Sequence, residues 1–103
     1  MMGIRGVIWY AQPRKEDARA ELRRITADYI NQKIMPVYHR EGLNHYCVGF
    51  ENGDYWQIRH ASESSRACYS NISYIDHTID EELVNIVIKP ATHLLPYNAY
   101  RYY

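Results

Sequence analysis

Residues 44–60, NHYCVGFENGDYWQIRH, decide much of the fold. Two runs rich in aromatic and β-branched side chains, 44–50 and 55–60, flank the tetrapeptide ENGD. An Asn-Gly pair between two such runs is the strongest short-range signal for a β-hairpin. We therefore predict two antiparallel strands joined by a turn at residues 51–54.

The stretch before this hairpin predicts a buried strand followed by a long helix. Residues 4–10, IRGVIWY, are dense in β-branched and aromatic residues without alternation, which is typical of a strand covered on both faces. Pro13, with acids at positions 16 and 17, indicates a helix start. Apolar residues then recur at steps of three and four, which predicts an amphipathic helix at residues 14–32. Its apolar positions are Ala18, Leu22, Ile25, Tyr29 and Ile30.

The other segments are shorter. Residues 33–39 contain Pro36, which confines a strand there to a sheet edge or a loop. Residues 61–66 predict a polar loop or one helical turn, and 72–76 a strand that ends in an acid. Residues 79–88 open with acids as a short helix does, although their second half fits a strand equally well.

We therefore expect one α/β domain over residues 1–103. It has a sheet of about four or five strands, one long amphipathic helix and one short helix. The tail at 90–103 is rich in Tyr and Pro, and no regular element is predicted for its end at 96–103. This tail is a candidate interface segment.

Composition excludes some classes of protein. Twelve Lys and Arg balance twelve Asp and Glu, so the chain lacks the positive field that a DNA-coating or membrane-surface protein needs. Two Cys allow at most one disulfide, and we expect both to be reduced thiols in a cytoplasmic protein. The apolar run at residues 7–11 is far shorter than the roughly twenty residues that cross a bilayer. We expect no membrane association.

The order of residues between 50 and 76 resembles the core of viral terminase large subunits and related helicase-type P-loop ATPases. In that family a hairpin reading F-x-N-G-S-x-I leads through a Ser/Ala segment into A-R-G, and then into a strand that ends in the acidic metal-site residue. The matching positions are Phe50, Asn52, Gly53, Ile58, Ala61, Ser62, Arg66 and Asp76. Residues 6–25 are similar to the family's strand, A-P-T turn and helix, and residues 81–90 to the helix after the acid.

This chain departs from the family where hydrolysis is performed. No G-x-x-x-x-G-K-[ST] motif is present, so the loop that cradles the nucleotide phosphates is missing. His77 stands where the family has the Glu that orients the attacking water, and Ala67 where it has a Gly. The resemblance therefore implies a virus-encoded, phage-like α/β core that retains the fold without the enzyme activity, and we expect no cofactor.

Five residues are candidates for ligand binding. Arg66 suits bidentate recognition of phosphate or carboxylate near Asp76, at the strand end where open α/β sheets bind ligands, although the pair also suits a loop anchor. His77 follows Asp76, but adjacent strand residues point to opposite faces, so we predict no metal site. Tyr55 and Arg59 share the outward face of the hairpin, where a ring beside a cation suits a nucleobase and a phosphate, or ordinary cross-strand packing. The basic side chains of the helix are expected to form a solvated face neutralised by acids at i,i+4.

The tyrosines of the tail are candidates for an interface. Tyr97, Tyr100, Tyr102 and Tyr103 are expected to pack either on the domain's own sheet or on a second copy of the chain, because Tyr is enriched at interfaces. A domain this small has little room for a deep pocket of its own. We therefore expect a homo-oligomer.

The sequence favours a non-catalytic protein that binds a nucleotide-type or phosphorylated small ligand as an oligomer, with sequestration of a host defence signal as its role. One alternative is a degenerate terminase fragment or accessory protein that binds nucleic acid, which the zero net charge makes the less favoured choice. Another is an interaction module that inhibits a host protein through its Tyr-rich tail.

Overall fold

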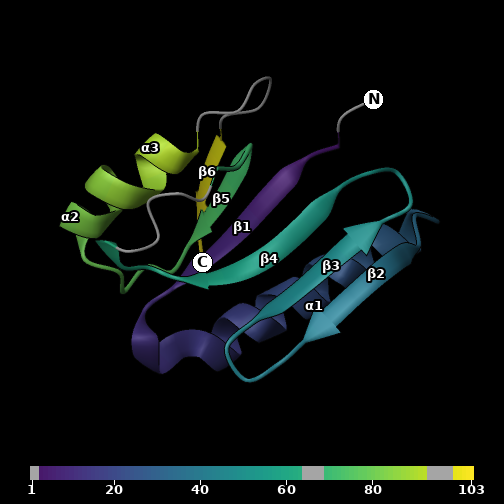
Figure 1. Ribbon diagram of the computed structural model, residues 1–103, viewed down its shortest axis with the longest axis horizontal. Coiled ribbons are helices and arrows are strands. Elements are labelled where there is room, and N and C mark those ends of the chain that lie inside the picture. Colours follow the sequence, from purple (N-terminus) through teal and green to yellow (C-terminus); the bar gives the residue numbers. More distant parts are fainter. Residues whose placement is uncertain (1–2, 64–68, 93–98) are drawn as a thin grey trace.

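Six strands form one mixed sheet in the computed structural model, which describes residues 3–63, 69–92 and 99–103 (Figure 1). The strand order is β2-β3-β4-β1-β5-β6. The strands are β1 (Arg5–Tyr10), β2 (Pro36–Glu41), β3 (Tyr46–Phe50), β4 (Tyr55–His60), β5 (Ile72–Ile75) and β6 (Ala99–Tyr102). The α/β class is confirmed, with one strand more than expected.

The first strand lies in the middle of the sheet, as predicted. It pairs in parallel with β4 on one side and with β5 on the other. Its residues from Gly6 to Tyr10 are all buried. Continuous burial on both faces explains why this segment shows no alternation of apolar and polar residues.

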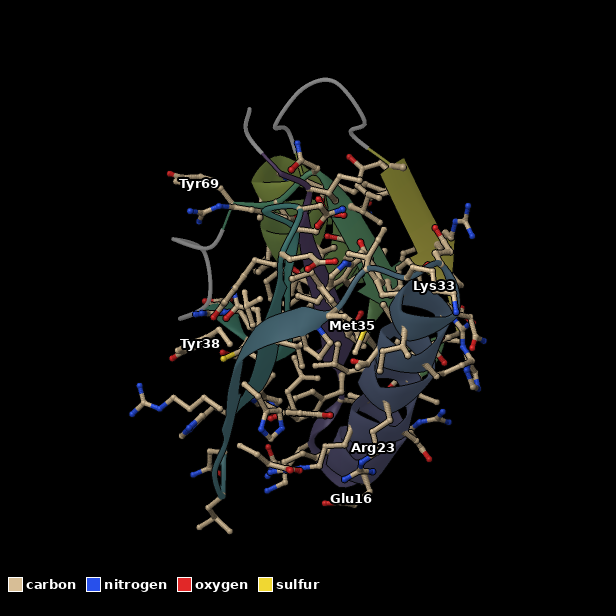
Figure 2. All side chains as sticks on the ribbon, turned by 90° about the vertical axis from the view of Figure 1, so that its right-hand side faces the viewer. Glu16, Arg23, Lys33, Met35, Tyr38 and Tyr69 are labelled. Atoms are coloured by element: carbon tan, nitrogen blue, oxygen red, sulfur yellow. The ribbon has the colours of Figure 1, made fainter. Side chains whose placement is uncertain are left out.

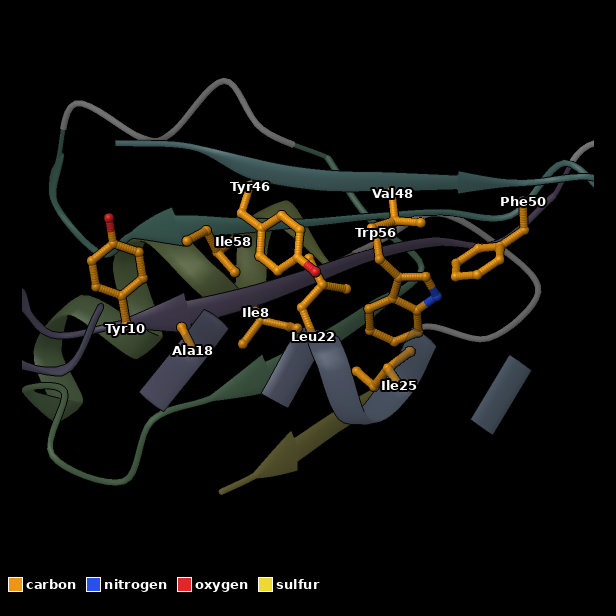
Figure 3. Packing of buried hydrophobic residues seen from close by; sticks show 10 residues of the cluster. All are labelled: Ile8, Tyr10, Ala18, Leu22, Ile25, Tyr46, Val48, Phe50, Trp56 and Ile58. Carbon is orange, nitrogen blue, oxygen red and sulfur yellow. The ribbon is translucent and has the colours of Figure 1, made fainter. Parts of the chain in front are cut away.

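The long helix α1 (Lys15–Asn31) follows a 3₁₀ turn (Gln12–Arg14) and covers one face of the sheet (Figure 2). Pro13 lies in that first turn, where its missing N–H is tolerated. Leu22 and Ala18 are fully buried against Ile8, and Trp56 closes the same cluster (Figure 3). The predicted helix is confirmed to within one residue at each end.

The second helical segment covers β1 and β5 on the opposite face. It consists of α2 (Glu81–Leu83), a π-helical stretch (Val84–Ile88) and α3 (Lys89–Ala91). Asp80 begins it, because its carboxylate accepts the Glu82 N–H. Val84, Val87 and Ile88 pack against Val7, Trp9 and Ile75 of the sheet. The alternative of a strand in residues 84–88 is therefore wrong.

The hairpin forms as its sequence predicts. Gly53 has a φ of 94°, a conformation that residues with a Cβ rarely adopt, and its N–H bonds the Phe50 carbonyl at 2.9 Å. The Phe50 N–H in turn bonds the Asp54 carbonyl at 2.8 Å. This turn fixes the register in which Gly49 pairs with Tyr55.

The sequence predicts the edge strand β2 but not the edge strand β6. The strand β2 starts at Pro36, carries a bulge between Pro36 and Tyr38, and lies at the edge, as expected of a Pro-containing strand. The strand β6 was not predicted, although it pairs in parallel with β5 from Ala99 to Tyr102. These four residues form a strand through their pairing with β5, and none of them is buried.

Candidate functional site

A pocket of about 440 Å³ opens at the edge of the sheet where β1 and β4 end side by side. This volume is in the range of roughly 300–1,000 Å³ that small-molecule sites occupy. Its lining residues are Tyr10, Gln12, Lys15, Asn44, His45, Gln57, Ile58, Arg59, His60 and Ser62. Most of these side chains are polar and none is acidic, so the pocket suits a polar or anionic ligand.

The pocket exists because β3 and β4 separate. Their pairing ends at Cys47 and Gln57, whereas β4 continues to His60. The chain before β3 instead turns away, in a turn closed by the Gly42 N–H and the His45 carbonyl at 2.9 Å. His45 and Asn44 thus line one wall, and the end of β4 lines another.

Cations from the first turns of α1 hold that turn in place. The Lys15 ammonium donates to the Leu43 carbonyl at 2.9 Å, and the Arg19 guanidinium donates to the same carbonyl at 3.0 Å. Arg19 also donates to the Glu41 carboxylate at 2.8 Å. The turn that carries Asn44 and His45 is therefore fixed to the helix.

The prediction of a solvated face is wrong for Arg19. Arg19 is 7% exposed, and its guanidinium packs between α1 and β2. Arg24 makes the expected i,i+4 pair with Asp28. Arg24 with Glu21 and Arg14 with Asp17 are i,i+3 pairs, and Arg23 pairs with Glu41 of β2 instead. The charge pattern gave no signal for Arg19, because its strongest partners lie more than twenty residues away.

Three arginines have a buried Nε atom in the described part of the chain, and Arg59 differs from the other two in having no carboxylate beside it. In the described part of the chain, the Nε atoms of Arg14, Arg19 and Arg59 are buried without a hydrogen bond. Those of Arg14 and Arg19 lie 3.0 and 3.5 Å from carboxylate oxygens. Arg59 has no such carboxylate among the described residues, and it lines the pocket. An unmatched buried donor costs about 1–3 kcal/mol.

Asp76 follows β5 at a second point on the same edge. The chain leaves β1 for α1 on one face and leaves β5 for α2 on the other, so the strand ends between them mark a topological switch point. Asp76 is fully buried there. Its Oδ2 accepts the Ala11 N–H at 3.0 Å, and its Oδ1 accepts both the N–H and the hydroxyl of Thr78 at 2.9 Å.

Through these contacts Asp76 connects the end of β1 to the end of β5. Burial tends to raise the pKa of the carboxyl, but the hydrogen bonds from Ala11 and Thr78 and the charge of Arg14 outweigh it and lower the pKa. Arg14 Nε lies 3.4 Å from Oδ1. The structure thus pairs Asp76 with Arg14, a contact that the sequence did not predict. Arg66, the predicted partner, lies outside the described residues.

The remaining predicted ligand residues lie apart from the pocket. His77 is exposed, and both its N–H and its Nδ1 lie within hydrogen-bond distance of the Tyr103 carbonyl. Tyr55 shares a sheet face with Arg59 but lies near the start of β4, and it does not line the pocket. Burial and a hydrogen bond with Cys47 raise the pKa of Tyr55 to about 12.

The predicted interface tyrosines divide into two groups. Tyr103 folds back on its own sheet, where its hydroxyl donates to the Trp9 carbonyl at 2.8 Å. Tyr100 and Tyr102 are 39% and 62% exposed on β6, although the Tyr100 hydroxyl reaches the Lys89 carbonyl. Tyr97 lies outside the described residues.

The described residues hold neither a metal cluster nor a membrane-spanning helix. No three His, Cys, Asp or Glu side chains lie close enough together to hold a metal ion in residues 3–63, 69–92 and 99–103. Over the same ranges, no helix has the length and apolar character required to span a bilayer.

Comparison with known proteins shows one similarity, which is a similarity of fold. No family model and no curated protein matches the chain. A large terminase from a thermophilic bacteriophage has a similar structure, with a TM-score of 0.58 and 11% sequence identity. The match covers 99% of this chain and 26% of the terminase chain, so this chain spans about a quarter of that protein's length. The fold is therefore terminase-like, in agreement with the resemblance of the sequence, and identity this low shows the fold alone.

Proposed function

We propose that this protein is a non-catalytic binding protein that holds a nucleotide-type or other phosphorylated small molecule in the pocket at the ends of β1 and β4. The observation that carries the proposal is the guanidinium-bearing Arg59 in the lining of a pocket that has no acidic lining residue. A phosphate offers several oxygen acceptors to a guanidinium in a geometry that water does not reproduce. Lys15 adds a second cation to the pocket lining.

The aromatic rings of the pocket support a nucleotide rather than free phosphate. Tyr10 and His60 both line it, and their ring centroids lie 5.8 Å apart at an interplanar angle of 41°. Tyr10 is only 4% exposed, so the partly exposed His60 ring is the one that gives a nucleobase a surface for stacking. The volume of about 440 Å³ is sufficient for a base and a phosphate together.

Two features favour binding over turnover. The sequence lacks the phosphate-binding loop on which phosphoryl transfer depends in P-loop enzymes. Among the described residues, the carboxylate at the end of β5 is engaged by Ala11, Thr78 and Arg14 and does not line the pocket. A protein of this kind acts by holding its ligand. From the terminase-like fold we propose a viral origin for the protein, and a host defence signal as the ligand that it sequesters.

Calorimetry with inorganic phosphate and a panel of linear and cyclic nucleotides tests the proposal. Arg59→Gln is expected to weaken binding about ten-fold or more, because hydrogen bonds to charged groups contribute roughly 1.5–3 kcal/mol. Arg24→Gln is the matched control, since Arg24 is an exposed arginine on α1 that does not line the pocket. Absence of binding across the panel, or an equal loss in the control, contradicts the proposal.

Self-association through β6 is part of the same proposal. Tyr100 and Tyr102 remain exposed on a strand at the sheet edge, where backbone groups are available for pairing with a second copy. Native mass spectrometry is expected to show an oligomer that Tyr102→Ser weakens. Leu43→Ser, at a site 81% exposed in the turn between β2 and β3, is expected to leave the oligomer intact. A monomeric wild-type protein contradicts this part.

A further inference from the structure

In the part of the chain that the structure describes, the sheet has an open face opposite α1. The helical segment α2–α3 packs there on residues of β1 and β5, and no described helix covers β2, β3 and β4 on that side. We call this area the open face. One row across it runs from Tyr38 through Gly49 and Tyr55 to Arg5, because these residues are register partners and so point to the same side. Figure 2 shows Tyr38 pointing away from the side on which α1 lies.

Two tyrosines border bare backbone at the centre of the open face. A Cβ placed on Gly49 would lie 3.4 Å from Tyr38 Cβ and 3.7 Å from Tyr55 Cδ2, so the rings stand on either side of this glycine. Tyr38 is 49% exposed, and Tyr55 is half-buried. Aromatic side chains on a sheet surface provide stacking positions for unpaired bases.

The open face also carries arginines without acidic partners. Arg5, Arg40 and Arg59 point to it from β1, β2 and β4, and none has an ion pair with a described residue. The helix arginines, by contrast, are all paired with acids.

The acids of the same strands are engaged elsewhere. Glu41 pairs with Arg19 on the α1 side, and Asp54 accepts the Tyr29 hydroxyl. Glu51 accepts the Met35 N–H at the hairpin turn. The zero net charge of the chain therefore conceals a separation of charge. It argues against a nucleic-acid coat for the whole molecule, but it does not describe this face.

We propose that the open face binds single-stranded nucleic acid, with bases stacked on Tyr38 and Tyr55 and phosphates bound by Arg5, Arg40 and Arg59. This inference rests on the proposed function, because Arg59 belongs both to the pocket and to the open face. Tyr55 and Arg59 are four residues apart on one strand, a separation of about 13 Å. A mononucleotide fills the pocket alone, whereas an oligonucleotide continues from the pocket across the open face.

Fluorescence anisotropy with labelled oligonucleotides of increasing length tests this inference, beside calorimetry with mononucleotides. DNA and RNA arms identify which nucleic acid binds, and a duplex arm tests the requirement for single strands. We expect an eight-nucleotide strand to bind at least ten-fold more tightly than a mononucleotide. Tyr38→Ser is expected to remove about ten-fold of the affinity for the strand and to leave mononucleotide binding unchanged.

Salt titration measures the arginine contacts separately. Each lost phosphate contact reduces the slope of log K against log salt by about 0.7 for single strands, so Arg40→Gln is expected to show this change. Arg24→Gln, on the opposite side of the sheet, is expected to keep the wild-type slope. Thermal unfolding of each variant checks that the fold is intact.

The outcomes separate the two proposals. Affinity that does not rise with length, duplex binding equal to that of single strands, or wild-type oligonucleotide binding by Tyr38→Ser overturns the open-face inference, whatever the mononucleotides do. Tyr38-dependent oligonucleotide binding without any mononucleotide binding supports the open face and contradicts the pocket function. An oligomer that Tyr38→Ser disrupts and that binds no oligonucleotide identifies the open face as a contact between copies, and also overturns the inference.

Discussion

The Tyr103 hydroxyl donates a 2.8 Å hydrogen bond to the carbonyl oxygen of Trp9, ninety-four residues earlier in the chain. The Tyr103 N–H donates to the Ile75 carbonyl, and the Tyr103 carbonyl accepts the His77 N–H, both at 3.0 Å. Burial raises the pKa of its hydroxyl. This one residue thus connects the central strand, the strand beside it and the start of the following turn.

Tyr103→Phe keeps the ring and removes only the hydroxyl. We expect a loss of about 1 kcal/mol in the free energy of unfolding, the usual net contribution of a hydrogen bond. Urea denaturation measures it. Tyr102→Phe, at a position 62% exposed, is the control and is expected to change stability by less than about 0.5 kcal/mol. Equal effects of the two substitutions contradict the assigned role of Tyr103.

Local signals in the sequence predicted the elements whose chemistry is local. The Asn-Gly turn, the amphipathic period of α1 and the unbroken apolar run of β1 each depend on neighbours within a few residues, and each is confirmed. The strand β6 depends on β5 for its pairing, and its own residues predict nothing. The pocket could not be predicted, for a similar reason. The sequence indicates Arg59 as a candidate ligand residue, but Lys15 and His45 come together with it only after the sheet has formed.

Asp76→Asn is expected to destabilise the protein by about 3 kcal/mol at pH 7, because it removes one charge of a buried pair. The pKa of Asp76 is lowered in the folded protein. Its contribution is therefore present above the unfolded pKa of about 3.9, and it is lost as the pH falls through the folded value. Urea denaturation at pH 7, 4 and 3 measures both effects.

The wild-type protein should lose stability below about pH 4, and Asp76→Asn should lose less over the same interval. Asp17→Asn is the control, because Asp17 is exposed and also pairs with Arg14. It is expected to change stability by less than about 1 kcal/mol. If the stability of the wild type and of Asp76→Asn depends on acid pH in the same way, titration of Asp76 does not contribute to stability.

Arg19→Gln is expected to lower the free energy of unfolding by about 2 kcal/mol, since it leaves Glu41 and the turn carbonyls without their buried donor. Hydrogen exchange is expected to accelerate at Gly42, whose N–H closes that turn. Arg24→Gln removes a comparable guanidinium from exposed pairs and is expected to change stability by less than about 0.5 kcal/mol. Unchanged exchange at Gly42 in Arg19→Gln contradicts the anchoring role.

Gly6→Ala is expected to be strongly destabilising. The added Cβ would lie 2.2 Å from Trp56 Cε3, and Trp56 is 4% exposed and packs edge-on against Tyr74. Overpacking of a filled core costs roughly 1–3 kcal/mol. Gly49→Ala meets ordinary contacts from 3.4 Å outward and is expected to be tolerated. Thermal unfolding compares the two, and a tolerated Gly6→Ala would show that the Trp56 ring can move.

The central position of β1 has a consequence for synthesis of the chain. Its partners are far along the sequence, since Arg5 pairs with Tyr55 and Gly6 pairs with Ile72. Val7 and Trp9 are fully buried in the folded protein, so they stay exposed on the ribosome until the segment that forms β5 has been made. Such non-local pairing folds slowly, because long loops must close before the sheet gains its contacts. The nascent chain therefore passes through a period in which its most apolar strand is open to chaperones and to aggregation.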